Sequence, residues 1–381
     1  MLAENRSGQH RPAESRAWRE ETNTVSNLLN DAVQFAQTHE VPWPREPGAA
    51  PAPGQLPWGV HHDDPPPFNR LRGPVHARGP QSGVVRQKGA DVIWWGEPGR
   101  ADLTFSVAKS YLALLAGVAQ RDGLLPDEDE PVVARLPGIG FDSEHNRAVT
   151  WTHLLTQTSE WEGSCFGVPD TVDRWRQVTH DPRPAAGPKG GARPLRAPGS
   201  YWEYNDVRIN QLALALLHLF RRPLPEVFLE QILRPLGGGA EFAWRGYDDA
   251  WVDLAGVGRV PSVPGGTHWG AGVSISAHDQ ARIGQLVLDG GVAAGRTLIA
   301  PGWLERMAMP CPIAPWYGRL VWLNRNQRAF PGASPHALFM VGAGGHYVWI
   351  DADLDAVVVL RWLDPQHANA AIERIAAALA R

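Results

Sequence analysis

The sequence predicts an α+β fold, in which an antiparallel sheet flanked by helices stands beside a mostly helical lobe. Two observations support this prediction. Strand-like runs occur toward both ends of the chain, within 73–97 and 346–364, and the most apolar helical run, residues 104–120, lies between them. Because a sheet must bury a face against other elements, we expect strands from both ends to form one sheet with a helical insertion beside it.

The first part of the chain is expected to be peripheral. Residues 22–40 have apolar residues at roughly helical spacing, at Val25, Leu28, Leu29, Val33 and Phe35. Residues 42–67 are rich in proline and glycine, which indicates a linker or a wrapping arm. We therefore assign residues 1–68 to an N-terminal helix and arm, and residues 69–381 to the main domain.

The main domain begins with two β-like runs, GPVHARG at 73–79 and SGVVRQKGADVIWWGE at 82–97. Residues 104–120 are apolar almost all round, which indicates a buried helix with Thr104 as its cap. Helices are also predicted at 149–158, 206–220, 276–286 and 370–380, and two strands within 346–364. The loop 181–200 is a candidate flap. The sheet lobe would then span about 69–125 and 262–381, and the helical lobe about 126–261.

Composition excludes several classes of function. The chain has 36 basic and 40 acidic residues and no long basic run, which argues against a nucleic-acid or membrane partner. Its N-terminus lacks the apolar region of a secretory signal and no stretch is long enough to span a membrane, so we expect a cytoplasmic protein. The two cysteines, Cys165 and Cys311, are too few for a thiolate metal site.

The chemistry-bearing motif lies on the buried helix. Ser106 and Lys109 form an S-x-x-K motif, whose i, i+3 spacing places both side chains on one helix face. A serine hydroxyl becomes a good nucleophile when a neighbour takes its proton, and a buried lysine can serve as that base. Lysine occurs only three times among the 36 basic residues, and arginine could not replace it because it does not deprotonate. The alternative is a helix-cap serine beside a lysine that reaches solvent.

Two further motifs follow in order. Pro198-Gly199 precedes the run Tyr201-Trp202-Glu203-Tyr204-Asn205-Asp206 at the start of a helix, and a glycine-rich segment, 339–347, lies near the end of the chain. This ordered set resembles the serine β-lactamase and penicillin-binding-protein superfamily. It looks closest to the class C β-lactamase-like esterases and the 6-aminohexanoate-oligomer hydrolases. The resemblance implies a β-lactamase/transpeptidase-like fold.

The resemblance also implies roles for individual residues. Ser106 matches the acylated nucleophile, Lys109 the partner base and Tyr204 the tyrosine that relays a proton to the leaving group. Asp206 stands where the family usually has asparagine. The oxyanion hole would use the backbone N–H groups of Ser106 and of Ala343 or its neighbour, because small residues allow a substrate carbonyl to approach.

Several residues are expected to bind substrate. The third motif lacks the family's K-T-G lysine, which helps to bind the carboxylate of penicillins, so its absence argues against β-lactamase activity. Candidates that would line the cleft are Asp206, His268, Trp269, Gly344 and His346. The expected function is therefore a serine hydrolase that forms an acyl-enzyme on a small ester or amide. A catalytically silent binding protein and an acyltransferase remain alternatives.

No cofactor or metal is expected. The run from His61 to Asp64 could bind an ion, but adjacent residues seldom converge on one ion and prolines follow. The chain also lacks the G-x-S-x-G, H-E-x-x-H and phosphate-loop motifs of other enzyme classes. The sequence leaves the oligomeric state and the choice between ester and amide open.

Overall fold

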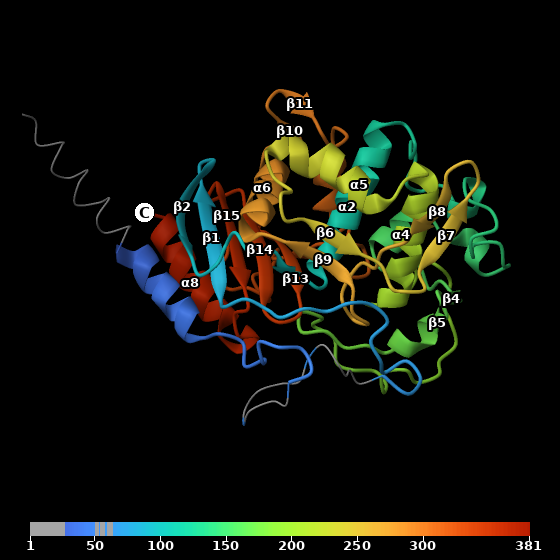
Figure 1. Ribbon diagram of the computed structural model, residues 1–381, viewed down its shortest axis with the longest axis horizontal. Helices are drawn as coiled ribbons and strands as arrows, with labels where there is room; N and C mark the ends of the chain where they lie inside the picture. The colour runs from blue at the N-terminus through green and yellow to red at the C-terminus, as the bar shows by residue number, and fades with distance from the viewer. Residues whose placement is uncertain (1–26, 50–52, 54–57, 59–63) are drawn as a thin grey trace, which may run out of the picture.

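A six-stranded antiparallel sheet, assembled from both ends of the chain, forms one side of the molecule (Figure 1). The computed structural model describes residues 27–49, 53, 58 and 64–381. The strand order is β12-β13-β14-β15-β1-β2. Its strands are β1 (Ser82–Gln87), β2 (Ala90–Trp95), β12 (Trp322–Leu323), β13 (Leu338–Gly342), β14 (His346–Asp351) and β15 (Ala356–Arg361).

Strand pairing explains how the two chain ends meet. Strand β1 pairs with β15 in a register that places Ser82 opposite Arg361. Lys88 and Gly89 connect β1 to β2, and both have positive φ, as a two-residue hairpin turn requires. Strands β14 and β15 are buried along their whole length, which explains why they read as continuous apolar runs.

Helices cover both faces of this sheet. Helix α6 (Ala277–Leu288) packs on β15, where Gly284 faces Val357 so closely that a Cβ would lie 2.4 Å from it. Helix α8 (Ala368–Leu379) lies on the other side, next to the helical residues 27–38 (Figure 1). The guanidinium of Arg374 lies 4.0 Å from the ring centroid of Phe35, which ties these two helices together.

Most of the other elements lie outside the six-stranded sheet. The remaining helices include α2 (Val107–Arg121), α3 (Trp151–Leu155), α4 (Asp206–Phe220), α5 (Leu224–Phe228) and α7 (Trp303–Met307). A three-stranded sheet has the order β3-β9-β6, with β3 (Asp102–Leu103), β9 (Gly272–Ile275) and β6 (Ala243–Arg245). Three short hairpins complete the list: β4 (Ser164–Cys165) with β5 (Val168–Pro169), β7 (Trp251–Leu254) with β8 (Gly258–Pro261), and β10 (Val292–Ala293) with β11 (Arg296–Thr297).

Three sequence expectations are wrong. Residues 73–79 form no strand, because Pro74 lacks an N–H and the segment makes scattered backbone hydrogen bonds, such as Arg78 N–H to Arg45, instead of a ladder. The helix expected over 149–158 spans only Trp151–Leu155. Ser106, not Thr104, occupies the N-cap of α2, and its side chain makes no capping hydrogen bond.

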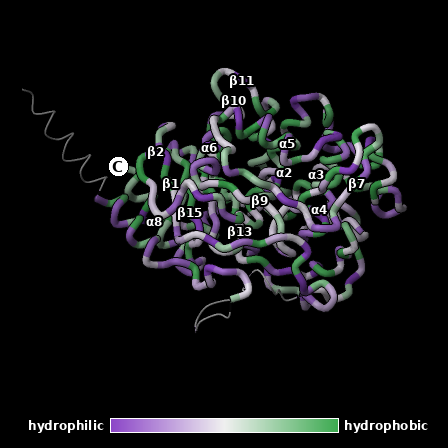
Figure 2. The backbone as a smooth tube through the Cα atoms, in the orientation of Figure 1, coloured by the Kyte–Doolittle hydropathy of each residue, from purple (hydrophilic) through white to green (hydrophobic). Residues whose placement is uncertain are grey.

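The described part of the proline- and glycine-rich arm packs against the domain. Val41, Trp43 and Trp58 join Phe105 and Trp362 in a separate aromatic cluster. The rings of Trp43 and Trp58 stack with centroids 5.9 Å apart. Within the described ranges, no helix has the length and apolar character needed to cross a bilayer. Figure 2 shows apolar and polar residues interspersed along the chain.

Candidate active site

Ser106 lies at the turn between β3 and α2. The preceding residue, Phe105, has φ +51°, a left-handed conformation that costs a bulky residue of the order of 1–3 kcal/mol. Packing compensates for this strain, since the Phe105 ring makes edge contacts with Trp43 and Trp362 at centroid distances of 5.7 and 5.9 Å. The aromatic cluster thus fixes the turn that presents the Ser106 hydroxyl.

Lys109 lies one helical turn after Ser106 and is only 1% exposed. Its Nζ donates a hydrogen bond to Ser106 Oγ at 2.9 Å and another to the carbonyl of Gly265 at 3.2 Å. It also lies 2.6 Å from Oδ1 of Asp206 and 4.8 Å from the ring centroid of Tyr204. The burial of Lys109 rules out the alternative that its side chain reaches solvent. Its amine instead points toward the Ser106 hydroxyl.

Asp206 connects Lys109 to a buried chain of charges. Its Oδ2 lies 2.8 Å from Arg176, which also contacts Asp173 at 3.1 Å. Burial alone would raise the pKa of the Asp206 carboxyl, but the adjacent Arg176 and Lys109 hold that pKa well below its ordinary value. Asp206 is therefore a carboxylate at neutral pH, and its charge balances two buried cations.

The charge chain continues away from Ser106. Lys189 lies 3.8 Å from Asp173 and 2.5 Å from Asp64, and Asp64 contacts His268 at 2.8 Å. Oxygen and nitrogen atoms of Asp64, Asp173 and His268 lie within 4.8 Å of one another, as in a cation site. The Lys189 ammonium contacts both carboxylates and offsets part of their negative charge. Residues 61–63, considered above for metal binding, lie outside the described residues.

Tyr204 lies between the Ser106–Lys109 pair and the sheet. Its ring stacks on Trp322 of β12 with centroids 5.9 Å apart and an interplanar angle of 25°. Arg176 lies 5.5 Å from the ring centroid, and Lys109 lies 4.8 Å from it. The tyrosine is thus held by aromatic packing and by two cations while its surface borders the same pocket as Ser106.

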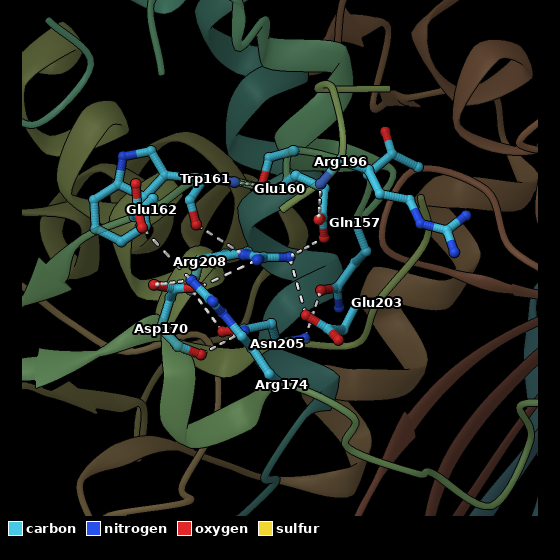
Figure 3. Close-up of polar contacts among 12 residues, drawn as sticks. Gln157, Glu160, Trp161, Glu162, Asp170, Arg174, Arg196, Glu203, Asn205 and Arg208 are labelled. Atoms are coloured by element: carbon cyan, nitrogen blue, oxygen red, sulfur yellow. Dashed lines mark hydrogen bonds and ion pairs between the residues drawn. The ribbon is translucent and has the colours of Figure 1, made fainter. Parts of the chain in front are cut away.

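The residue after Tyr204 has a structural role. Asn205 caps α4, because its Oδ1 accepts hydrogen bonds from the N–H groups of Val207 and Arg208. Its Nδ2 donates to the carbonyl of Asp170, and Gln157 accepts from its backbone N–H. Figure 3 shows Asn205 within a dense network that is centred on Arg208.

Buried ion pairs hold this network together. Arg208 lies 3.0 Å from Glu160 and 3.2 Å from both Asp170 and Glu203 (Figure 3). Burial would raise the pKa of Glu160, but hydrogen bonds from Arg193 and the charge of Arg208 lower it below its ordinary value. The network fixes the start of α4, and with it the positions of Tyr204 and Asp206.

Strand β13 closes the site from the sheet side. Gly342 approaches the segment before Ser106 so closely that a Cβ would lie 2.2 Å from the carbonyl oxygen of Thr104. Among the described residues, the backbone N–H groups of Ser106 and Ala343 donate to no protein acceptor. Two free N–H groups beside a serine hydroxyl are the arrangement that binds a developing oxyanion.

The pocket at Ser106 has a volume of about 240 Å³. Its wall includes Ser106, Arg176, His180, Tyr204, Trp322 and the segment 341–345. Burial lowers the pKa of His180 to about 4, so this imidazole is neutral at pH 7. Arg176 is then the one charged side chain among the described residues of the wall.

Not every predicted substrate residue lines this pocket. Gly344 and Ala343 do. His346 is instead fully buried, 4.3 Å from the Trp362 ring, and burial lowers its pKa to about 3. Trp269 is also buried and donates its indole N–H to Asp64 and to the carbonyl of Phe68. These two predictions need correction, because both side chains are directed into the core.

Asp206 and His268, which were also predicted to bind substrate, are not part of the pocket wall. Asp206 contacts Lys109 and Arg176, and His268 lies 4.0 Å from Asp206 through its Nδ1. Sequence reasoning missed Arg176 entirely. One signal was available: an aspartate in place of asparagine at 206 requires a positive partner when buried.

Known proteins with similar sequences include a hydrolase. A family model described as Beta-lactamase matches residues 103–380. A stretch of 110 residues is 34% identical to the 6-aminohexanoate-dimer hydrolase of Paenarthrobacter ureafaciens and covers 25% of this chain and 26% of that protein. The match thus spans about a quarter of the length of this curated relative.

Similar solved structures extend over more of the chain. EstCE1, a hydrolase with promiscuous acyltransferase activity, is 15% identical with a TM-score of 0.57, covering 95% of this chain and 99% of that one. An octameric penicillin-binding protein homologue from Pyrococcus abyssi is 18% identical with a TM-score of 0.54, covering 79% of this chain and 73% of that one. At sequence identities this low, the similarity to these two structures shows a shared fold and nothing about activity.

Proposed function

The chain belongs to the beta-lactamase family, and we propose that it is a serine hydrolase that uses Ser106 as its nucleophile. The family resemblance and the β-lactamase/transpeptidase-like fold that the motifs predicted are confirmed. One observation carries the proposal: the hydroxyl of Ser106 lies 2.9 Å from the buried Lys109 amine, beside two backbone N–H groups that have no acceptor among the described residues.

The proposed first step acylates Ser106. Ser106 Oγ attacks the substrate carbonyl carbon, and its proton passes to Lys109 in those molecules in which the amine has released its own proton. Asp206 then stabilises the ammonium that forms, as a buried carboxylate stabilises a protonated base in other hydrolases. The N–H groups of Ser106 and Ala343 hold the oxyanion. When the carbon–leaving-group bond breaks, Tyr204 supplies a proton to the departing atom and regains one from Lys109.

The proposed second step restores the enzyme. A water molecule attacks the acyl carbon, its proton passes to the same base, and the bond from that carbon to Ser106 Oγ breaks with return of a proton to the serine. If another alcohol or amine takes the place of water, the product is a transferred acyl group. The name of EstCE1 supports keeping this acyltransferase alternative.

The substrate we propose is a small ester or amide. The wall segment 341–345 contains no lysine, so the pocket lacks the cation that the family places on this strand. The name of the curated relative, 6-aminohexanoate-dimer hydrolase, supports an amide, because two amino acids are joined through an amide bond. Arg176 does not take over the carboxylate-binding role of the missing lysine, because Asp173 and Asp206 already balance its charge.

A panel of p-nitrophenyl esters and anilides tests the proposal. Wild-type protein is expected to hydrolyse at least one compound with a burst of product equal to the enzyme concentration, and Ser106→Ala is expected to lose both burst and turnover. Ser110→Ala is the matched control, because that serine lies on the same helix and donates to the carbonyl of Leu320. A folded wild type without turnover of any ester or amide would favour the silent binding protein.

A further inference from the structure

The two proposed oxyanion donors lie on separate parts of the chain. Ser106 precedes helix α2, whereas Ala343 follows strand β13 near the other end of the sequence. An oxyanion hole stabilises charge only when both N–H groups are held at hydrogen-bonding distance from one oxygen position. A side chain that contacts both segments can therefore fix the spacing between the two donors.

Trp43 of the N-terminal arm contacts both segments. Its ring meets the edge of the ring of Phe105, the residue before Ser106, at a centroid distance of 5.7 Å. It also lies so close to Gly344, the residue after Ala343, that a Cβ on this glycine would lie 3.0 Å from Cζ3 of the indole. One rigid ring thus touches the chain neighbour of each proposed donor.

Both contacted residues have left-handed backbone. Phe105 has φ +51° and Gly344 has φ +75°. This conformation is unfavourable for phenylalanine, so the turn before Ser106 persists only if its neighbours hold it. At position 344 glycine allows the rings to approach, since a Cβ there would also lie 2.9 Å from Trp362. Packing by the arm therefore bears on both sides of the site.

The backbone around Trp43 is anchored to the domain. Its carbonyl accepts a hydrogen bond from Nε of Arg78 at 3.2 Å, and the N–H of Val41 donates to the carbonyl of Trp362 at 2.8 Å. The Trp43 indole N–H is buried and has no acceptor among the described residues. Because an unpaired buried donor costs stability, the contacts of the ring account for its placement, and hydrogen bonding does not.

We infer that Trp43 is a positioning residue that holds the two halves of the proposed oxyanion hole at their working separation. The inference rests on the proposed function, because it concerns the same site. Trp43 does not line the Ser106 pocket, so it acts through Phe105 and Gly344. It also lies outside residues 103–380, so the arm supplies this contact from beyond the region that matches the family model.

Trp43→Ala tests the inference with the ester that wild-type protein hydrolyses best. Rates are divided by the concentration of active sites, which is titrated with a fluorophosphonate. Acylation and deacylation both pass through an oxyanion, so a loosened hole should lower kcat about tenfold or more. KM should change by less than about twofold, because these hydrogen bonds strengthen in the transition state.

Phe35→Ala is the matched control. This substitution also removes an aromatic ring from the N-terminal part of the chain, where Phe35 packs on Arg374. Phe35 belongs to the main hydrophobic core, whereas Trp43 and Phe105 belong to the separate aromatic cluster. The control should therefore keep the wild-type kcat even if it lowers the free energy of unfolding.

A thionoester comparison separates a displaced oxyanion hole from general loosening of the fold. Sulfur in place of the carbonyl oxygen is larger and a weaker acceptor, so an intact hole should favour the oxygen ester beyond the ratio of the two reactivities toward hydroxide. Trp43→Ala should reduce that preference about fivefold or more. Phe35→Ala should retain it.

Trp43→Leu is a second variant, because leucine keeps an apolar side chain but cannot reach both contacts. It should lower kcat and the oxygen preference in the same direction. Unchanged kcat and oxygen preference in either folded Trp43 variant, or an equal fall in Phe35→Ala, would overturn the inference while wild-type turnover upheld the proposed function. Absence of any wild-type turnover would contradict the proposed function and, with it, this inference.

Discussion

Asp206→Asn tests how the site balances its buried charges. The carboxylate lies 2.6 Å from Lys109 and 2.8 Å from Arg176, and Lys109 is 1% exposed. Arg176 keeps Asp173 as a partner after the substitution, whereas Lys109 loses its only acidic partner among the described residues. Breaking a buried ion pair from one side costs about 3–5 kcal/mol. Because asparagine retains an acceptor oxygen, we expect a loss of about 3 kcal/mol.

The assay is urea unfolding of both proteins at pH 7, with Asp253→Asn on the exposed face of β7 as control. The control should change the free energy of unfolding by less than about 0.5 kcal/mol. A loss below about 1 kcal/mol in Asp206→Asn, or one equal to the control, would refute the charge-balance reasoning.

The same reasoning predicts how the difference in free energy of unfolding between wild type and Asp206→Asn changes with pH. The folded pKa of Asp206 is held below its ordinary value, so the carboxylate's contribution is fully present above about pH 4, the unfolded pKa of an aspartate. It is lost as the pH falls toward the folded pKa. The gap between wild type and Asp206→Asn should therefore be constant from about pH 5 to 8 and narrow in acid. A gap that widens in acid would contradict this account.

Three further substitutions probe the proposed chemistry. Lys109→Arg should lower kcat/KM by about a thousandfold or more in ester hydrolysis assays, because the guanidinium keeps a positive charge but cannot accept the serine proton; near-normal activity would exclude Lys109 as the base. Tyr204→Phe keeps the packing on Trp322 but removes the hydroxyl, so anilide turnover should fall about a hundredfold while p-nitrophenyl ester turnover falls much less. Equal losses for both substrates would argue against proton donation by the tyrosine. Gly342→Ala should reduce kcat about a hundredfold by moving β13 away from the oxyanion site, since the new Cβ would lie 2.2 Å from a backbone oxygen. Gly99→Ala, which meets nothing within 4 Å, is its control, and equal activity of the two variants would show that the close approach is not needed.

Continuous periodic patterns predicted the fold well. Helix α4 and strands β14 and β15 lie where the apolar runs placed them, because each run is buried along most of its length. Residues 73–79 misled the prediction, since this β-like run makes backbone hydrogen bonds to several partners instead of pairing with one strand. Periodicity reports burial, whereas pairing depends on a partner that the local sequence does not contain.

The site was predictable only in part, for a related reason. Spacing on one helix brings Ser106 and Lys109 together, and their separation of 2.9 Å follows from that local geometry. Arg176 reaches Asp206 from a loop with no regular pattern, so nothing local indicated it. His346 was expected at the cleft because it ends the glycine-rich third motif, but its strand position directs the ring toward Trp362.

The most direct test of the central claim is identification of the residue that becomes acylated. Wild-type protein is treated with a fluorophosphonate probe, digested, and analysed by peptide mass spectrometry. We predict one modified peptide, with the adduct on Ser106, and no adduct in folded Ser106→Ala protein. An adduct on any other residue, or none on folded wild-type protein that hydrolyses esters, would contradict the assignment of Ser106 as the nucleophile.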